Sequence, residues 1–374
     1  MPTYGQYDVP KSDVMINMGV GQPDNRKLPL DLVKKGMKHF VESCDDQEIL
    51  QYGDIPGYPR FRNKMAKWLS SKYRNEVLES ELFITNGNTQ AINLIMNEFM
   101  EQGDTIIVED PSYFIMINIF KDFDLDIEKV PINDDGVDVE ELEDIVSSLY
   151  EKQKNVFFYT IPFNHNPTGV NMSEQNKLAL AKICDTYENF YVISDEVYHF
   201  LSWVDNEEEY YQPLAEYHKN IISCGSFSKI LAPSLRLGWI YCMDDTDEDS
   251  TLVALKSSSF YDSAGGTAAI SSYIVEQLLD SGDLDKYIES CKEFLKNRCD
   301  SICDTIDSIS NGLVTYARPI GGYFVWVNLH ELNSDELLEK AITNKVKFHQ
   351  GWKFTSDKDD FTNFIRLSFS FYDE

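Results

Sequence analysis

The sequence lacks the features of a membrane protein, a disulfide-bonded secreted protein and a metalloprotein. No apolar run among its 374 residues approaches the length of a membrane span, and its N-terminus has no charged-then-apolar signal pattern. Its seven cysteines include no CxxC pair, and its six histidines include no HExxH pair. We therefore expect a cytoplasmic chain with reduced cysteines and no metal site.

Positive charge is also scarce. The chain has 33 lysines and arginines against 63 aspartates and glutamates, which gives a formal net charge of −30. Nucleic acids and anionic membrane surfaces require a basic patch, so we expect neither as a partner. A small anionic ligand is still possible, because exposed charges are screened within roughly 8–10 Å at physiological salt.

Apolar runs alternate with helical patterns in the middle of the chain. Three predicted helices cover residues 89–100, 138–150 and 173–187, and the last has Ser173 as its N-cap. Continuous apolar strands between helices are typical of an α/β fold with a mostly parallel sheet. The predicted strands are residues 82–85, 105–109, 155–160, 190–194, 220–224 and 238–242.

The pattern changes after residue 265. Two long helices are predicted at 267–280 and 283–307, followed by the strand-like "GGYFVWVNL", a helix near 334–344 and "FIRLSFSF". A chain of 374 residues is long enough for two domains. The C-terminal pattern therefore predicts a second, smaller α+β domain.

Polar or aromatic side chains follow five of the predicted strands, where α/β sheets bind their ligands. In the last of these segments Lys229 stands between two serines and Arg236 among apolar residues, which is unusual for a surface lysine. We expect the five segments to form one site. They read "NGNTQ", "DPSYF", "IPFNHNPTG", "DEVYHF" and "GSFSKILAPSLRLGW".

Five motifs, in their order and spacing, resemble the fold-type I pyridoxal-phosphate (PLP) aminotransferases of class I/II: "NHNPTG", "SDEVY", "SFSKILAPSLRLGW", "GGYFVW" and "FIRLSFS". The branch resembled contains the kynurenine and α-aminoadipate aminotransferases. The resemblance implies pyridoxal 5'-phosphate as the cofactor and a homodimer with shared active sites. It also implies a large PLP-binding domain over residues 46–264, with a seven-stranded sheet, and a small domain formed by residues 1–45 and 265–374.

The resemblance assigns roles around the cofactor ring. Lys229 would form an imine with the cofactor, and burial beside cations would lower its proton affinity and make it nucleophilic. Asp195 would face the pyridine nitrogen and keep the ring protonated. Tyr198 and Asn166 would hydrogen-bond the phenolic oxygen of the ring, and Tyr113 would stack on the ring face.

The cofactor phosphate has its own set of expected ligands. By resemblance they are Ser226, Ser228 and Arg236, together with Asn88 and Thr89 at the start of a helix. An arginine suits this role because its planar fork pairs with two phosphate oxygens, and a helix N-terminus attracts anions. Tyr52 would reach a phosphate in the neighbouring subunit.

The expected substrate contacts centre on Arg366, which would bind the α-carboxylate bidentately. Asn166 would assist it, and Gly21 would lie near the substrate by resemblance. Arg26 is a candidate for the distal carboxylate of a dicarboxylic substrate, because N-terminal segments of this family often close over the substrate.

Several of these residues have simpler interpretations. Asp195 would cap a helix, Arg366 would form a structural ion pair in so acidic a chain, and Tyr52 would be an ordinary loop tyrosine. Tyr58 is a competing candidate for the role of Tyr52. The flanking serines and Arg236 argue against the simpler interpretation of Lys229 as a surface lysine.

The sequence departs from the family at two places. "DSAGGTAAISS" lacks a serine or threonine followed four residues later by glutamine, which bears on a cross-subunit phosphate contact. His349 and Gln350, in "HQGWKF", stand where the family commonly has proline-glycine, and we expect them to bear on substrate choice.

The sequence thus predicts an aminotransferase that moves an amino group between an amino acid and a 2-oxo acid such as 2-oxoglutarate by a ping-pong mechanism. The donor class stays open between aminoadipate-like, aromatic and broad. The alternatives are a PLP-dependent lyase on β-substituted amino acids and a catalytically silent PLP-binding regulatory protein.

Overall fold

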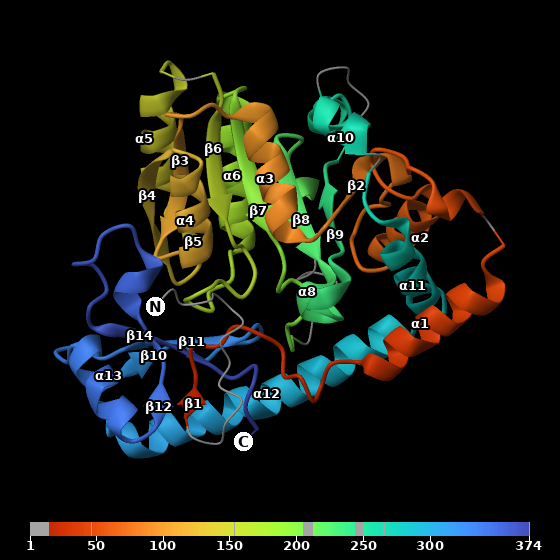
Figure 1. Cartoon of the computed structure of the whole chain (residues 1–374). Coiled ribbons are helices and arrows are strands. Elements are labelled where there is room, and N and C mark those ends of the chain that lie inside the picture. Colours follow the sequence, from red (N-terminus) through yellow and green to blue (C-terminus); the bar gives the residue numbers. More distant parts are fainter. Residues whose placement is uncertain are drawn as a thin grey trace.

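An eight-stranded mixed sheet with strand order β2-β9-β8-β7-β6-β3-β4-β5 dominates the fold (Figure 1). We describe residues 15–45, 47–152, 154–204, 212–243, 250–264 and 266–373 of the computed structural model. β4, β3, β6, β7 and β8 pair in parallel, whereas β9 is antiparallel to both its neighbours and β5 is antiparallel to β4. The strands are β2 (Leu82–Thr85), β3 (Thr105–Asp110), β4 (Asp126–Asn133), β5 (Gly136–Val137), β6 (Val156–Thr160), β7 (Phe190–Asp195), β8 (Ile221–Ser226) and β9 (Gly238–Tyr241).

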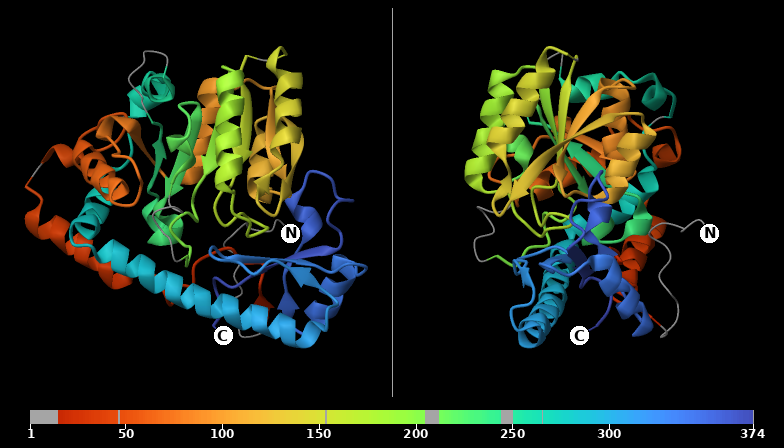
Figure 2. Two further views of the ribbon diagram at one scale, coloured as in Figure 1. Left: turned by 180° about the vertical axis from the view of Figure 1, so that it is seen from behind. Right: turned by 90° about the vertical axis from the view of Figure 1, so that its left-hand side faces the viewer.

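Helices cover both faces of this sheet, as the right-hand view of Figure 2 shows. Alternate residues of a strand point to opposite faces, so Ile106 joins the core under α3 (Asn88–Phe99) and α4 (Phe114–Asp122), whereas Ile107 joins the core under α5 (Val139–Tyr150) and α6 (Glu174–Thr186). The predicted α/β class is confirmed, and the hydroxyl of Ser173 caps α6 as expected.

The sheet differs from the prediction at one edge. All six strands predicted from apolar runs are present, but β4 was missed, because its sequence "DIEKVPIN" mixes charged and apolar residues and most of its side chains are at least partly exposed. The two-residue β5 extends the sheet beyond β4, so the sheet has eight strands rather than the seven expected.

A four-stranded antiparallel sheet lies below the larger one in Figure 1, with order β10-β11-β14-β13. Its strands are β10 (Thr315–Tyr316), β11 (Phe324–Asn328), β14 (Phe364–Ser368) and β13 (His349–Gln350). A separate two-stranded parallel pair joins β1 (Ile16–Asn17) to β12 (Val346–Lys347). The long helix α12 (Asp283–Ser310) runs below both larger sheets in Figure 1 and in the left-hand view of Figure 2.

The other helices complete the chain. α1 packs on α11, and α11 packs on α2. No helix within the described ranges is both long and apolar enough to cross a membrane. The remaining bounds are α1 (Leu30–Ser43), α2 (Pro59–Ser70), α8 (Phe227–Ile230), α9 (Thr251–Lys256), α10 (Ser259–Ala264), α11 (Ala269–Asp280) and α13 (Ser334–Thr343).

Candidate active site

The predicted site residues lie where the strands of the large sheet end. Asp195 is the last residue of β7, and β8 runs directly into the short helix α8, which carries Lys229. Asn166 follows β6, and Tyr113 follows β3 as the N-cap of α4. Because β3, β6, β7 and β8 are parallel, these ends meet at one edge of the sheet.

Lys229 occupies an environment that favours its neutral form. Its Nζ donates to the carbonyl oxygen of Gly21 at 2.8 Å and lies 5.7 and 5.4 Å from the ring centroids of Tyr198 and Tyr323. Burial lowers the pKa of Lys229 to about 8, even though Asp195 opposes the shift. A sizeable fraction of such an amine is neutral at physiological pH, as a nucleophile or general base requires.

Asp195 is a buried carboxylate that is hydrogen-bonded on one side. The Tyr159 hydroxyl donates to Oδ2 at 2.8 Å. Burial raises the pKa of Asp195 to about 6, although the Tyr159 hydrogen bond and the charge of Lys229 act against the shift. A protonated ring nitrogen placed against Asp195 would supply a cationic hydrogen-bond partner for this carboxylate.

Arg366 is a fully buried cation in β14. Its side chain is 2% exposed, and within the described part of the chain no carboxylate forms an ion pair with it. Nη1 donates to Asn166 Oδ1 at 2.7 Å and Nη2 to the carbonyl of Gly19 at 2.8 Å, whereas Nε has no partner among the described residues. Burial lowers the pKa of Arg366 to about 10, which leaves it charged.

Two aromatic rings enclose the Arg366 guanidinium. Its central carbon lies 3.9 Å from the ring centroid of Phe324 in β11 and 4.7 Å from that of Phe354. Such contacts orient the planar guanidinium and exclude water from it. A buried, oriented arginine without a carboxylate partner is a suitable site for an external carboxylate.

A second anion-binding surface lies at the start of α3. Arg236 packs over Gly87, where an added Cβ would lie 2.5 Å from Nη2, and donates from that nitrogen to the Asn86 carbonyl at 2.8 Å. The buried Oδ1 of Asn88, the first residue of α3, has no hydrogen-bond partner among the described residues.

The hydroxyls of Ser226 and Ser228 lie 2.9 Å apart at the end of β8. Ser226 is the N-cap of α8, where its Oγ accepts from the Ser228 amide at 3.1 Å. Together with Arg236 and the α3 N-terminus, these hydroxyls form a set that fits a phosphate group.

Three other predicted residues are more exposed. Thr89 is exposed on the first turn of α3, and Tyr52 is 79% exposed. Arg26 is 60% exposed, and its guanidinium pairs with Asp24 at 2.9 Å and with Asp373 at 2.5 Å.

His349 and Gln350 form β13, beside the Arg366 strand. His349 is directly opposite Arg366, and its ring packs 5.5 Å from that of Phe114. Burial, together with the charge of Arg366, holds the pKa of His349 well below its usual value, so its side chain is neutral. Gln350 donates to Asp335 at 2.9 Å, away from Arg366.

Sequence reasoning missed the residues that support the site. Tyr159 lies in an apolar strand, and nothing in "NVFFYT" distinguishes its hydroxyl as a partner of Asp195. Phe324 lies within the motif "GGYFVW", but its contact with Arg366 depends on the pairing of β11 with β14. Phe354 and Gly19 had no sequence signal.

Comparison with known proteins decides the family. A model described as "Aminotransferase class I and II" matches residues 13–374. The chain belongs to this family. It is a PLP-dependent aminotransferase of fold type I, and the polar groups around Lys229, Asp195 and Arg236 fit that cofactor.

Individual relatives cover nearly the whole aminotransferase. It is 30% identical over 374 residues to aromatic-amino-acid aminotransferase 1 of Thermococcus litoralis, covering 98% of this chain and 86% of that protein. It is similar to the crystal structure of Pyrococcus horikoshii kynurenine aminotransferase in complex with PMP, with a TM-score of 0.85, 28% identity, and coverage of 97% of this chain and 87% of that one.

One relative has a different description. The uncharacterized HTH-type transcriptional regulator YisV of Bacillus subtilis is 28% identical over 365 residues, covering 97% of this aminotransferase but 71% of that protein. The regulator therefore contains a further segment that this chain does not match.

Proposed function

We propose that this aminotransferase moves an amino group from an amino acid to a 2-oxo acid, such as 2-oxoglutarate, in a ping-pong cycle. The observation that carries the proposal is an amine with a lowered pKa and a buried guanidinium in one site. Arg366 is buried and Lys229 is half-buried, the charge of Arg366 helps to lower the pKa of Lys229, and neither side chain forms an ion pair within the described part of the chain. One site thus offers a neutral amine for chemistry and a guanidinium for a carboxylate.

Lys229 acts as the proton carrier in this proposal. When bound, PLP supplies the electron sink for the electrons left when a substrate Cα–H bond breaks. Between turnovers Lys229 would hold the cofactor. Its lowered pKa lets it accept the Cα proton near neutral pH and return it, as efficient general base catalysis requires.

Fixed polar groups hold the cofactor on both sides in the proposal. Asp195, held by Tyr159, keeps a proton on the ring nitrogen, because an ionised buried carboxylate stabilises an adjacent cation. Tyr198 and Asn166 would hydrogen-bond the phenolic oxygen, and Tyr113 would stack on the ring. Ser226, Ser228, Arg236, Asn88 and Thr89 hold the phosphate.

Arg366 orients the substrate by its α-carboxylate. The Asn166 oxygen accepts from Nη1, which leaves the Asn166 amide nitrogen available as a second donor to the same carboxylate. The Phe324 and Phe354 rings limit the motion of the guanidinium and shield it from water. Gly21 packs against the Phe324 ring that contacts Arg366, and its carbonyl accepts from Lys229.

We infer an aromatic donor in preference to an aminoadipate-like one. Phe114, Phe354 and the neutral ring of His349 cluster next to Arg366. Arg26, the candidate for a distal carboxylate, already pairs with Asp24 and Asp373. The similarity to aminotransferases named for aromatic amino acids and kynurenine also favours aromatic donors.

We further propose a cytoplasmic homodimer with shared active sites. Tyr52 is 79% exposed and the nearby apolar Leu50 is 74% exposed, as expected of a surface that a second copy covers. Within each chain we assign residues 46–264 to a large cofactor-binding domain, and residues 1–45 and 265–374 to a small domain.

A donor panel tests the proposed function. The purified holoenzyme is mixed with single amino acids, and the spectrum of the bound cofactor is followed with no acceptor present. We expect aromatic donors to convert the cofactor, and 2-oxoglutarate to restore it with glutamate as the product. Release of ammonia from β-substituted amino acids would favour a lyase. A cofactor that no amino acid converts would favour the silent regulatory protein, which the similarity to YisV keeps as a second candidate.

A further inference from the structure

A short segment before α1 contacts both Arg366 and Lys229. We name residues 18–24 the strap. Its Gly19 carbonyl accepts from Arg366 Nη2, and its Gly21 carbonyl accepts from Lys229 Nζ, both at 2.8 Å. Backbone oxygens of one segment therefore help to set the positions of the two side chains that the proposed function assigns to substrate binding and to proton transfer.

The neighbouring carbonyls of the strap bind the C-terminal part of the chain. The Met18 oxygen accepts from the Ser368 amide at 2.7 Å, and the Ser370 hydroxyl donates to Gln22 at 2.7 Å and to Val20 at 3.3 Å. The carbonyls of Gly19 and Gly21 thus contact Arg366 and Lys229. The other carbonyls of the strap accept hydrogen bonds from Ser368 and Ser370, which hold the strap in place.

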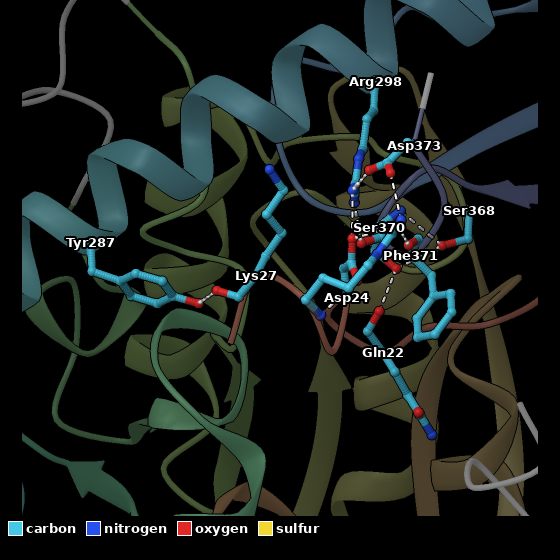
Figure 3. A network of polar contacts seen from close by, with 10 residues as sticks. Gln22, Asp24, Lys27, Tyr287, Arg298, Ser368, Ser370, Phe371 and Asp373 are labelled. Carbon is cyan, nitrogen blue, oxygen red and sulfur yellow. Dashed lines mark hydrogen bonds and ion pairs between the residues drawn. The ribbon is translucent and has the colours of Figure 1, made fainter. Parts of the chain in front are cut away.

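A partly buried ion cluster fixes the far end of the strap (Figure 3). Arg298, which projects from α12, donates from Nη2 to Asp24 and to Asp373, both at 2.7 Å, and from Nη1 to the Ser370 carbonyl at 2.8 Å. Arg26 pairs with the same two carboxylates. We name Asp24, Arg26, Arg298 and Asp373 the anchor cluster.

The charges of the anchor cluster compensate each other. Arg298 and Asp24 are only 5% and 1% exposed, so each would be costly to bury alone. Burial acts to raise the pKa of Asp24, but hydrogen bonds from Arg26 and Arg298 outweigh it and hold the pKa below its ordinary value. Asp24 is therefore ionised at neutral pH and remains paired with Arg298.

We propose that Arg298 is a positioning residue for the active site. Through Asp24 and the Ser370 carbonyl it fixes both the strap and the segment that holds the strap, and so it fixes the carbonyls that orient Arg366 and Lys229. The proposal rests on the proposed roles of those two cations. A long side chain that is already oriented loses less conformational entropy when its ligand binds, so a loosened strap weakens substrate binding.

Hydrogen exchange of the holoenzyme measures the strap directly. In Arg298→Met we expect peptides over residues 18–24 to exchange about tenfold faster, because local opening becomes easier, whereas peptides of β6–β8 keep their rates. Arg318→Met is the matched control. Arg318 also pairs with aspartates of α12, at 2.6 Å for Asp304, but on the exposed surface, so its loss leaves strap exchange unchanged.

Ser370→Ala is the second variant, because it loosens the strap without removing a charge from the interior. If Arg298→Met accelerates exchange throughout the chain, Ser370→Ala decides: faster exchange confined to the strap supports the proposal, and unchanged strap exchange contradicts it. Unchanged strap exchange in Arg298→Met also contradicts it.

Kinetics separates positioning from a merely structural role. In both variants we expect the KM for amino donors to rise about fivefold while kcat changes less than about twofold, because the loss lies in substrate binding. A loosened strap with an unchanged KM would overturn the proposal. Failure of Lys229 to carry the cofactor would instead overturn the proposed function, and borohydride labelling detects that separately.

Discussion

The catalytic centre and the anchor cluster both bury arginines, but they neutralise them differently. Arg298 is 5% exposed and pairs with two aspartates, whereas Arg366 is 2% exposed and, within the described residues, donates hydrogen bonds to an amide oxygen and a carbonyl but to no carboxylate. Removing a charge from water costs several kcal/mol unless a partner compensates it. The anchor cluster contains its own compensation, whereas the catalytic centre leaves Arg366 for the carboxylate of a substrate.

Buried arginines in this chain therefore serve two purposes, one in stability and one in function. A buried arginine with carboxylates on the protein contributes to folding, and breaking its pairs leaves other charges buried. A buried arginine without such carboxylates contributes little to folding. The free energy of removing its charge from water is offset only when an anionic ligand binds. The strap joins the two regions, because Asp24 belongs to the anchor cluster and Gly19 contacts Arg366.

The largest expected effect tests the catalytic side of this comparison. Arg366→Lys keeps the charge but loses the planar fork. We therefore expect kcat/KM to fall for every amino acid and oxo acid tested, by a factor that corresponds to about 2–5 kcal/mol of lost transition-state binding. Steady-state kinetics with several substrates measures this, with the exposed Arg318→Lys as the control. A loss restricted to one substrate would mean that Arg366 binds a side chain and not the common carboxylate.

Arg298→Met tests the contribution of the anchor cluster to stability. It leaves Asp24 buried with only Arg26 as its cationic partner, so we expect the free energy of unfolding to fall by about 3 kcal/mol, the lower end of the range for a broken buried pair. Urea unfolding measures the loss. Arg366→Met should unfold at the same urea concentration as the wild type or a higher one, and equal losses in the two variants would remove the distinction between the two regions.

Tyr52 tests whether a second copy of the chain contributes to the catalytic centre. If a second copy supplies this exposed hydroxyl to the phosphate site, Tyr52→Phe removes one hydrogen bond to a charged group and weakens cofactor binding by about 1.5–3 kcal/mol. Equilibrium titration of the cofactor-free protein with PLP measures the change. Weaker binding in Tyr58→Phe and wild-type binding in Tyr52→Phe would assign the contact to Tyr58 instead.

The smallest expected effect is a shift in pH dependence. Only the neutral amine reacts, so the rate at which cofactor-free protein combines with PLP should rise with pH and level off above about 8, the pKa of Lys229. Asp195 favours the charged amine, so Asp195→Asn should move the midpoint to lower pH. Arg366 disfavours it, so Arg366→Met should move the midpoint to higher pH.

A stopped-flow pH series records both midpoints, and Arg318→Met serves as the unshifted control. Shifts in the same direction for Asp195→Asn and Arg366→Met would contradict the electrostatics described for Lys229.

The sequence predicted what is local and missed what depends on distant contacts. The strands with continuous apolar runs were predicted because burial on both faces is visible in the residues themselves, whereas β4 carries charged side chains at the sheet edge and escaped notice. The residues in the motifs around Lys229 and Asp195 occupy neighbouring strand ends. Their supporting partners do not follow from any motif, because Arg298 and Asp24 are 274 positions apart in the chain.

The most direct test of the central assignment is borohydride reduction of the wild-type holoenzyme, followed by peptide mapping of the labelled lysine. We expect the cofactor to be attached to Lys229 alone, the amine of α8 beside Asp195, Tyr198 and Gly21. Attachment to any other lysine, with Lys229 unlabelled, would contradict it.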